Sequence, residues 1–222
     1  MSATFHPPEE LLLAYAAGSL EEASALLVAC HLTLCPACRR LAGQAEAVGG
    51  SLLEELAPAS LSDGALAAVL GRLGPVSATA RPAVRQAPAR PQPPRPGLLP
   101  RPLRDYVGAD SAALPWKRLP GGLEQVPVVT RTDARARLYR IAPGMGVPEH
   151  SHGGLEMTLV LAGGFSDGHG HYGPGDVAVM ADGGIHRPVA DAGDPCLCLA
   201  VTTAPLRLTG LIGRLFNPFL DL

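Results

Sequence analysis

One histidine and two cysteines near the start of the chain have the spacing of metal ligands. His31, Cys35 and Cys38 form the pattern H-x3-C-x2-C. Residues three or four positions apart share one face of a helix, so the three side chains can converge. Imidazole and thiolate are ligands of tetrahedral Zn²⁺, which then needs a fourth ligand; the best candidate is His6, just before a predicted helix. The alternatives are a redox dithiol, or two ordinary thiols with a chance histidine upstream.

A second group of candidate ligands lies in the last third of the chain. His150 and His152 alternate, and side chains two positions apart share a face of a strand. Glu156 returns on the next predicted strand, and His186 follows a later one. Three imidazoles and one carboxylate form a site for a divalent metal, with zinc as the first candidate and Fe, Mn or Ni as others. The alternative is a set of exposed loop histidines that bind no metal.

The composition restricts the classes of protein that fit this chain. Its 222 residues are 47% hydrophobic and carry a net charge of −2, which allows a sizeable core and gives no general reason to expect nucleic-acid binding. No basic segment precedes an apolar run at the N-terminus, and no stretch approaches the roughly 18 apolar residues of a membrane span. We expect a cytoplasmic protein with no direct DNA binding and no membrane contact. Its five cysteines are then ligands or core thiols rather than disulfides.

Charge and proline content divide the chain into three parts. Residues 1–75 carry eight acids and three bases, residues 76–104 carry six arginines and no acid, and residues 105–222 carry twelve acids and nine bases. Nine prolines fall within residues 75–102, where no apolar periodicity is found. Such a segment is typical of an extended tether. We therefore predict a domain at 1–75, a Pro/Arg-rich linker at 76–104 and a second domain at 105–222.

The first domain has the signals of four short helices. Their apolar spacing and capping residues predict helices from Pro7 to Gly18, from Ser19 to Leu34, from Pro36 (with Cys35 near its cap) to about Leu56, and from a Ser62–Asp63 cap to Gly74–Pro75. Helices this short bury little apolar surface. Since a bound metal can contribute on the order of 10 kcal/mol to folding, we predict a zinc-stabilised helical bundle.

The second domain has the signals of an all-β fold. Short β-rich runs are punctuated by glycine and proline, as in a barrel or double sheet; they begin at Val126, Ala136, Met157, Asp176 and Cys196. Cys196 and Cys198 share one strand face, so we expect both thiols to pack in the core. We also expect Cys30 to be a buried core thiol on its helix. His169 and His171 lie in a Gly-rich segment that predicts an exposed hairpin.

The second group of ligands resembles the motifs of the cupin superfamily. The first motif, G-x5-H-x-H-x3,4-E-x6-G, matches from Gly144 through the three ligands to Gly163. The second, G-x5-P-x-G-x2-H-x3-N, matches at Gly175, Gly183 and His186, with Ala181 in place of the proline and Ala190 in place of the asparagine. The resemblance implies a cupin barrel, or double-stranded β-helix, with its metal on His150, His152, Glu156 and His186.

The whole chain resembles the ChrR-type zinc-binding anti-sigma factors, in which an N-terminal zinc helical domain is joined to a C-terminal cupin. The resemblance implies zinc on His6, His31, Cys35 and Cys38. It also implies a group IV (extracytoplasmic-function) sigma factor as the partner, bound and inhibited by the helical domain and released in a singlet-oxygen-like response that needs the cupin. We expect the apolar faces of the later helices to supply the contact, through Leu52, Leu53, Leu56, Leu66 and Leu70.

Two other functions remain open at this point. A cupin with three histidines and a glutamate can belong to a metal-dependent enzyme of the dioxygenase or isomerase type, although no general base stands out in the sequence. A small-molecule or metal sensor with another partner is the third possibility. We expect a regulator and no enzymatic activity, largely because of the resemblance.

Overall fold

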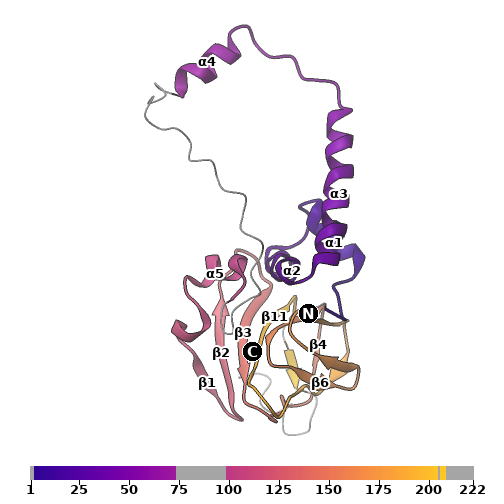
Figure 1. The fold of residues 1–222 in the computed structure, drawn as a ribbon, viewed down its shortest axis with the longest axis vertical. Helices are drawn as coiled ribbons and strands as arrows, with labels where there is room; N and C mark the ends of the chain where they lie inside the picture. Colours follow the sequence, from indigo (N-terminus) through magenta and orange to yellow (C-terminus); the bar gives the residue numbers. More distant parts are fainter. Residues whose placement is uncertain (1–2, 74–98, 205, 209–222) are drawn as a thin grey trace.

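The computed structural model describes residues 3–73, 99–204 and 206–208. Helices occupy the N-terminal part and strands the C-terminal part, as predicted (Figure 1). The described helices are α1 (Glu9–Ala16), α2 (Glu22–Leu34), α3 (Pro36–Glu54), α4 (Ala65–Arg72) and α5 (Arg101–Val107), with a 3-10 turn at Ser111–Ala113. Among the described residues no single helix is long and apolar enough to span a membrane, although α2 and α3 reach that length and composition as a bent pair.

The helix boundaries follow local chemistry and correct two predictions. The second helix begins at Glu22 rather than Ser19, because the Glu21 carboxylate accepts hydrogen bonds from the first free backbone amides of the helix. Cys35 caps α3 as predicted, with proline at the first helical position. The predicted Ser62–Asp63 cap of α4 is wrong, since Gly64 stands at that position without a side-chain hydrogen bond.

The strands form one large sheet and two small ones that face it. The large sheet has the order β1-β2-β3-β11-β5-β8, and the small sheets are β10-β6-β7 and β12-β4-β9. All the pairings are antiparallel. The strand bounds are β1 Lys117–Leu119, β2 Leu123–Val128, β3 Arg135–Ile141, β4 His150–His152, β5 Glu156–Ala162, β6 Phe165–Asp167, β7 Gly170–Tyr172, β8 Val177–Met180, β9 Ile185–His186, β10 Val189–Ala190, β11 Cys196–Thr202 and β12 Leu206–Leu208.

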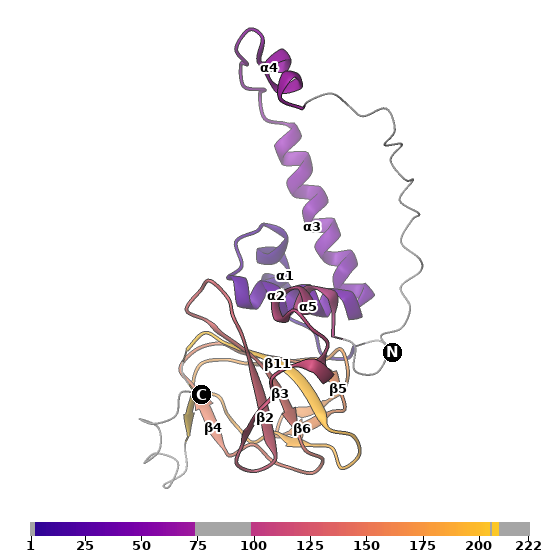
Figure 2. The ribbon, with the colours of Figure 1, turned by 90° about the vertical axis from the view of Figure 1, so that its left-hand side faces the viewer.

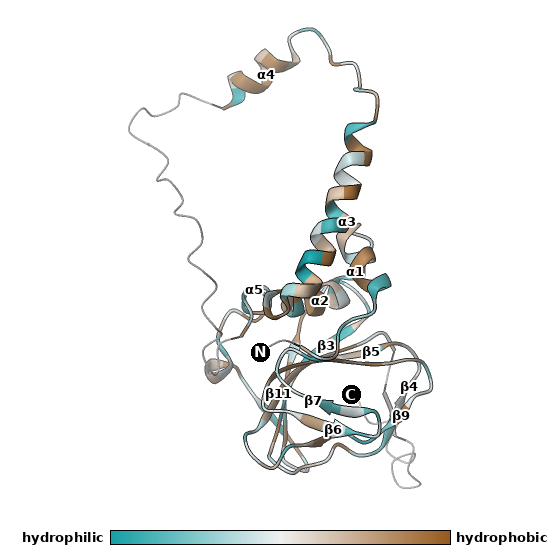
Figure 3. Ribbon diagram, turned by 45° about the vertical axis from the view of Figure 1, so that its right-hand side comes forward, coloured by the Kyte–Doolittle hydropathy of each residue, from teal (hydrophilic) through white to brown (hydrophobic). Residues whose placement is uncertain are grey.

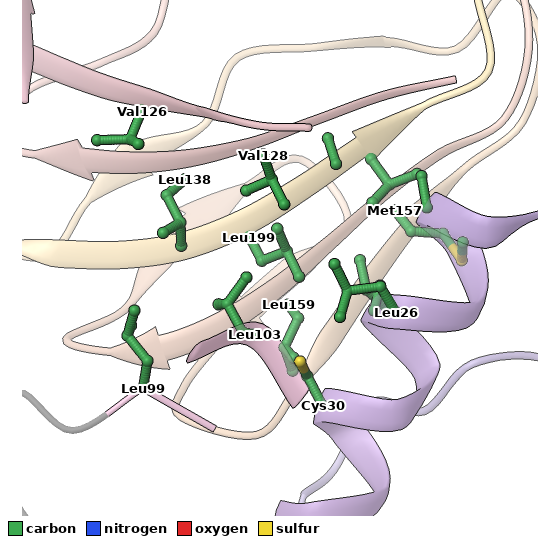
Figure 4. Close-up of a cluster of buried hydrophobic side chains, with 14 of the residues drawn as sticks. Leu26, Cys30, Leu99, Leu103, Val126, Val128, Leu138, Met157, Leu159 and Leu199 are labelled. Atoms are coloured by element: carbon green, nitrogen blue, oxygen red, sulfur yellow. The ribbon is translucent and has the colours of Figure 1, made fainter. Parts of the chain in front are cut away.

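The alternation of side chains gives the large sheet two different faces. One face, with Leu138, Leu159 and Leu199, packs against α2 and α5 in the main core. Figure 4 shows Leu26 and Cys30 of α2 pointing into this cluster. Cys30 is fully buried there, and burial raises its pKa to about 12, so the thiol is an inert core group, as predicted.

The opposite face of the large sheet points into the barrel. Cys196 and Cys198 lie there in a second cluster with Phe165 and Tyr172, which confirms the expectation of core packing for both thiols. Both faces of the sheet are therefore covered, one by helices and the other by the small sheets. This arrangement fixes which residues of β3, β5 and β11 can reach the interior of the barrel.

The helical part is packed directly on the barrel through α2, whereas α3 and α4 project away from it (Figures 1 and 2). The predicted linker falls mostly outside the described residues. Its last residues are described and include Leu99 and Leu103, both buried in the main core. The boundaries at residues 75 and 104 stay predictions.

We expect the main core to supply much of the stability of the barrel. Leu159→Ala should lower the free energy of unfolding by about 2–5 kcal/mol, because Leu159 is fully buried between the sheet and α2. The measurement is chemical denaturation of the full chain. Leu53→Ala is the matched control: Leu53 is 70% exposed, so we expect a change within about 0.5 kcal/mol. Equal effects of the two substitutions would contradict the packing described.

Candidate metal centres

The structure brings together the four N-terminal residues that the sequence pattern singled out. Their ligand atoms all lie within 4.8 Å of one another. His6 Nδ1 is 3.5 Å from Cys35 Sγ and 3.4 Å from Cys38 Sγ. In a tetrahedral zinc site with ordinary Zn–N and Zn–S bonds, such ligand atoms are about 3.5 Å apart. The spacing therefore fits a zinc ion.

One nitrogen of His31 in this cluster lacks a partner. Its Nδ1 lies 2.9 Å from the carbonyl oxygen of Gly175, which can only accept, so Nδ1–H is the donor. Nε2 is then left with a lone pair, and it is buried without a hydrogen bond among the described residues. A buried polar atom without a partner is costly. A metal ion ligated by Nε2 would remove that cost.

Burial also acts on the protonation of this cluster. Burial, followed by the neighbouring Cys35, raises the pKa of Cys38 to about 12. Burial lowers the pKa of His31, so its imidazole is neutral and ready to ligate. Two thiols at this spacing become thiolates only if a cation offsets their charge, because ligation requires the deprotonated form. A structural metal site fits these residues better than a redox dithiol, whose attacking thiol needs a lowered pKa.

The second group forms a buried cluster inside the barrel. The ligand atoms of His150, Glu156 and His186 lie within 4.8 Å of one another, and all three residues are buried. His186 Nε2 is 3.2 Å from a Glu156 carboxylate oxygen and 2.9 Å from His150 Nε2. The backbone of His152 lies on β4 beside His150, but its side chain is outside the described part of the chain. Its role as a fourth ligand stays a prediction.

The tautomers of the two described histidines direct lone pairs at the same point. His150 Nδ1 lies 2.8 Å from the Pro148 carbonyl, and His186 Nδ1 lies 3.2 Å from a carboxylate oxygen of Asp167. If both Nδ1 atoms donate, both Nε2 atoms are acceptors, and two acceptors at 2.9 Å repel unless a proton or a cation lies between them. Burial lowers the pKa of His186, but Glu156 and Asp167 outweigh it and raise the pKa overall. The site is therefore built to attract positive charge.

Three supporting groups were not predicted from the sequence. The carbonyls of Pro148 and Gly175 and the fully buried carboxylate of Asp167 each hold the second ring nitrogen of a candidate ligand. Such partners fix the tautomer and orientation of ligating histidines. Two of them are backbone atoms, which leave no signal in residue identity. Asp167 stands 19 positions from His186 and reaches it only through the folding of the barrel.

The N-terminal segment is hydrogen-bonded to the turn that leads into β8. The buried carboxylate of Asp176 accepts hydrogen bonds from the backbone amides of Thr4, at 2.6 Å, and Phe5, at 3.0 Å. The amide of Val177 donates to the carbonyl of Phe5 at 3.1 Å. The chain just before His6 is thus bound to the turn that also provides the Gly175 carbonyl for His31.

Aromatic contacts continue this connection into the barrel. The Phe5 ring lies 4.6 Å from Tyr172, which is stacked on Phe165 at 4.9 Å. Phe165 and Tyr172 belong to the β6–β7 hairpin, which also carries Asp167, the partner of His186. A continuous set of contacts therefore leads from one candidate metal centre to the other.

His169 and His171 lie on the exposed hairpin, as predicted. Their side chains are 53% and 61% exposed, and His171 pairs with Asp191. Neither belongs to the two clusters that could hold a metal among the described residues.

Comparison with known proteins places the whole chain in one family. Residues 105–206 match the ChrR cupin-like domain family. The anti-sigma-E factor ChrR of Cereibacter sphaeroides is 46% identical over 219 residues, which are 99% of each chain. This chain belongs to the ChrR family. The resemblance seen in the sequence is confirmed, and the strands of the C-terminal part form a cupin-like fold.

Solved structures extend the comparison to a complex. The structure of Rhodobacter sphaeroides SigE with the anti-sigma factor ChrR matches with a TM-score of 0.77 and 43% identity, covering 90% of this chain and 100% of that one. An acetylacetone dioxygenase of Acinetobacter johnsonii matches 44% of this chain and 74% of its own, at 15% identity and a TM-score of 0.39. A likeness that low gives no indication of function.

We expect Asp167→Asn to weaken metal binding in the barrel by about 10–100-fold, because the amide can present its NH₂ group to His186 and no longer stabilises the ligating tautomer. The measurement is competition against a chelator, with metal analysis of the full chain. Asp182→Asn, at an exposed position, is the control and should leave the affinity unchanged. Wild-type affinity in Asp167→Asn would rule out the supporting role of Asp167.

Proposed function

We propose that this chain is an anti-sigma factor that binds a group IV sigma factor and blocks its access to core RNA polymerase. The observation that carries this proposal is the match of 99% of this chain to an anti-sigma-E factor ChrR. A ChrR structure that covers 90% of this chain was solved in complex with the sigma factor SigE. The chain would act in the cytoplasm, where sigma factors meet polymerase, as a regulator that neither binds DNA itself nor catalyses a reaction.

The projecting helices carry an apolar surface that suits a protein partner. Leu66, Val69 and Leu70 of α4 and its C-cap residue Leu73 follow helical spacing and are 56–71% exposed. Leu52, Leu53 and Leu56, at the end of α3 and just beyond it, are 61–70% exposed. Figure 3 shows this apolar character on α4 and along α3, away from the barrel. An exposed apolar helix face is typical of docking into a groove on a partner.

We expect Leu66→Asp with Leu70→Asp to abolish sigma-factor binding without affecting folding, because both side chains are exposed in the chain alone. The measurement is co-purification with the sigma factor and transcription from its promoter, with thermal melting as the folding check. Val129→Asp, at an 81% exposed apolar position on the barrel, is the matched control. A double variant that still binds and inhibits the sigma factor would remove this surface from the proposal.

The N-terminal centre would be a structural zinc site that orients α3. Its ligands come from four places: the segment before α1, the last turn of α2, the residue between α2 and α3, and the first turn of α3. The chain bends by 119° there, between the two long helices α2 and α3. A bound Zn²⁺ would hold this bend, because its bonds to ligands on both helices resist their rotation. The direction of α3, and with it the apolar surface, would depend on the metal.

The barrel centre would control release. We propose a divalent metal on His150, His152, Glu156 and His186, with zinc as the first candidate and Fe, Mn or Ni as alternatives, and a response to singlet oxygen or a related oxidant. A change at this centre would reach the zinc cluster through Asp167, the β6–β7 hairpin and Phe5, which are in direct contact. This route needs no signal through the Pro/Arg-rich linker.

Two sets of substitutions should separate these roles. His150→Ala or Glu156→Ala should keep sigma inhibition and lose release by oxidant, because the barrel centre lies far from the docking surface. Cys35→Ser or Cys38→Ser should lose inhibition itself, because the bend between α2 and α3 is no longer held. The measurement is sigma-dependent transcription with and without oxidant. The same loss of inhibition in both sets would contradict the division of roles.

A further inference from the structure

Residues 3–6 lie between the helical part and the barrel and contact both. The Ala3 side chain packs against the helical cluster that contains the two candidate zinc cysteines, and the Phe5 side chain packs against the second cluster, inside the barrel. His6 follows directly. Its side chain is exposed, yet its Nδ1 lies within 3.5 Å of both thiols. Since packing does not hold an exposed side chain, His6 reaches the thiols because the chain is fixed on both sides of it, by α1 after it and by the barrel before it.

The barrel holds the chain before His6 by main-chain hydrogen bonds at the edge of a sheet. Among the described strands, β8 is the last strand of the large sheet. At its outer edge the Val177 amide donates to the Phe5 carbonyl, and the neighbouring Asp176 carboxylate accepts from the amides of Thr4 and Phe5. Where a sheet edge binds a peptide, such main-chain bonds give affinity and pockets for side chains give specificity. The Phe5 side chain has such a pocket.

Gly170 makes room for the Phe5 ring. The ring lies 4.6 Å from Tyr172, and a Cβ atom on Gly170 would lie 3.0 Å from its Cζ, so a side chain there would displace it. Gly170 begins β7 and does not have a positive φ, so its backbone does not require glycine. What the glycine supplies is space for Phe5. We call Gly170, Tyr172, Asp176 and Val177 the tail slot.

We propose that docking of residues 3–5 in the tail slot positions His6 as the fourth zinc ligand, with Asp176 and Phe5 as positioning residues that do not ligate the metal. The structural zinc site belongs to the proposed function, on which this inference rests, and the barrel sets how tightly that site binds zinc. The slot holds His6 at the zinc, and zinc on His6 holds the tail in the slot, so each strengthens the other by the same factor. Loss of the slot contacts leaves the other three ligands and weaker zinc binding.

The test is titration of the full chain with cobalt(II), followed by competition with zinc. Thiolate-to-cobalt absorption reports the N-terminal centre alone, because the candidate ligands in the barrel contain no sulfur. Phe5→Ala should weaken zinc binding there at least about tenfold, as loss of the contacts that orient a ligand does. Asp176→Asn should act in the same direction, because one of its two acceptor oxygens becomes a donor. Leu13→Ala is the control for Phe5→Ala: Leu13 is 53% exposed on α1, and its removal should leave the affinity unchanged.

The cobalt(II) spectrum supplies a readout that a loss of stability alone would not change. The visible bands depend on the identity and geometry of the ligands. In Phe5→Ala the spectrum should shift toward that of His6→Ala, because water replaces the same imidazole in both variants. A wild-type spectrum in Phe5→Ala would contradict the positioning role of Phe5.

The reciprocal effect is measured without altering the slot, so the test stands even if a slot variant fails to fold. Zinc added to the metal-free wild-type chain should slow hydrogen–deuterium exchange at the Thr4 and Phe5 amides at least about tenfold, and this slowing should be absent in His6→Ala. Equal zinc affinity in Phe5→Ala and wild type, or equal exchange with and without zinc, would overturn the inference and leave the proposed zinc site standing. A wild-type chain whose thiols bind no zinc would overturn both.

Discussion

The buried carboxylate of Asp176 fixes the relation between the two halves of this protein. It accepts hydrogen bonds from the amides of Thr4 and Phe5 with one oxygen and from the amide of Gly173 with the other. A carboxylate bound by several backbone amides is a strong and directional anchor. It places His6 beside the cysteines and brings the Gly175 carbonyl to His31. The barrel thus holds the N-terminal candidate cluster in place, although all four of its candidate ligands belong to the N-terminal part of the chain.

The same packing explains how a barrel centre could affect a helical surface. Helix α2 is part of the main core of the sheet, and the segment before α1 is bonded to the turn before β8. Helix α3 begins at the N-terminal candidate metal cluster and leaves the barrel from there (Figure 2). A small rotation at its first turn would therefore be carried to the exposed leucines at its far end. Inside the barrel, Glu156 of the large sheet meets His150 and His186 of the small sheet β12-β4-β9, so the candidate metal cluster lies between two sheets.

The sequence predicted the parts of this structure that depend on local patterns. The spacing of His31, Cys35 and Cys38 on helices, the period-two alternation around Cys196 and Cys198, and the cap at Cys35 are local, and each was found. The start of α2 was missed, because glutamate is a less common cap than serine. The short strands β9 and β10 were also missed, and the hairpin predicted around His169 and His171 came without the bounds of β6 and β7, since two or three residues carry too little periodicity. Asp167, Asp176 and the backbone carbonyls act across the fold, and no spacing in the sequence predicts such contacts.

Hydrogen–deuterium exchange at the backbone amides of Thr4, Phe5 and Val177 would show whether the contacts around Asp176 open when the sigma factor is released. The measurement uses the chain in complex with its sigma factor, before and during exposure to a releasing dose of singlet oxygen, with the core amide of Leu199 as an internal reference. We predict that exchange at the three amides rises together with release while Leu199 stays protected, and that neither the rise in exchange nor the release occurs in His150→Ala. Release of the sigma factor with the three amides still fully protected would contradict it.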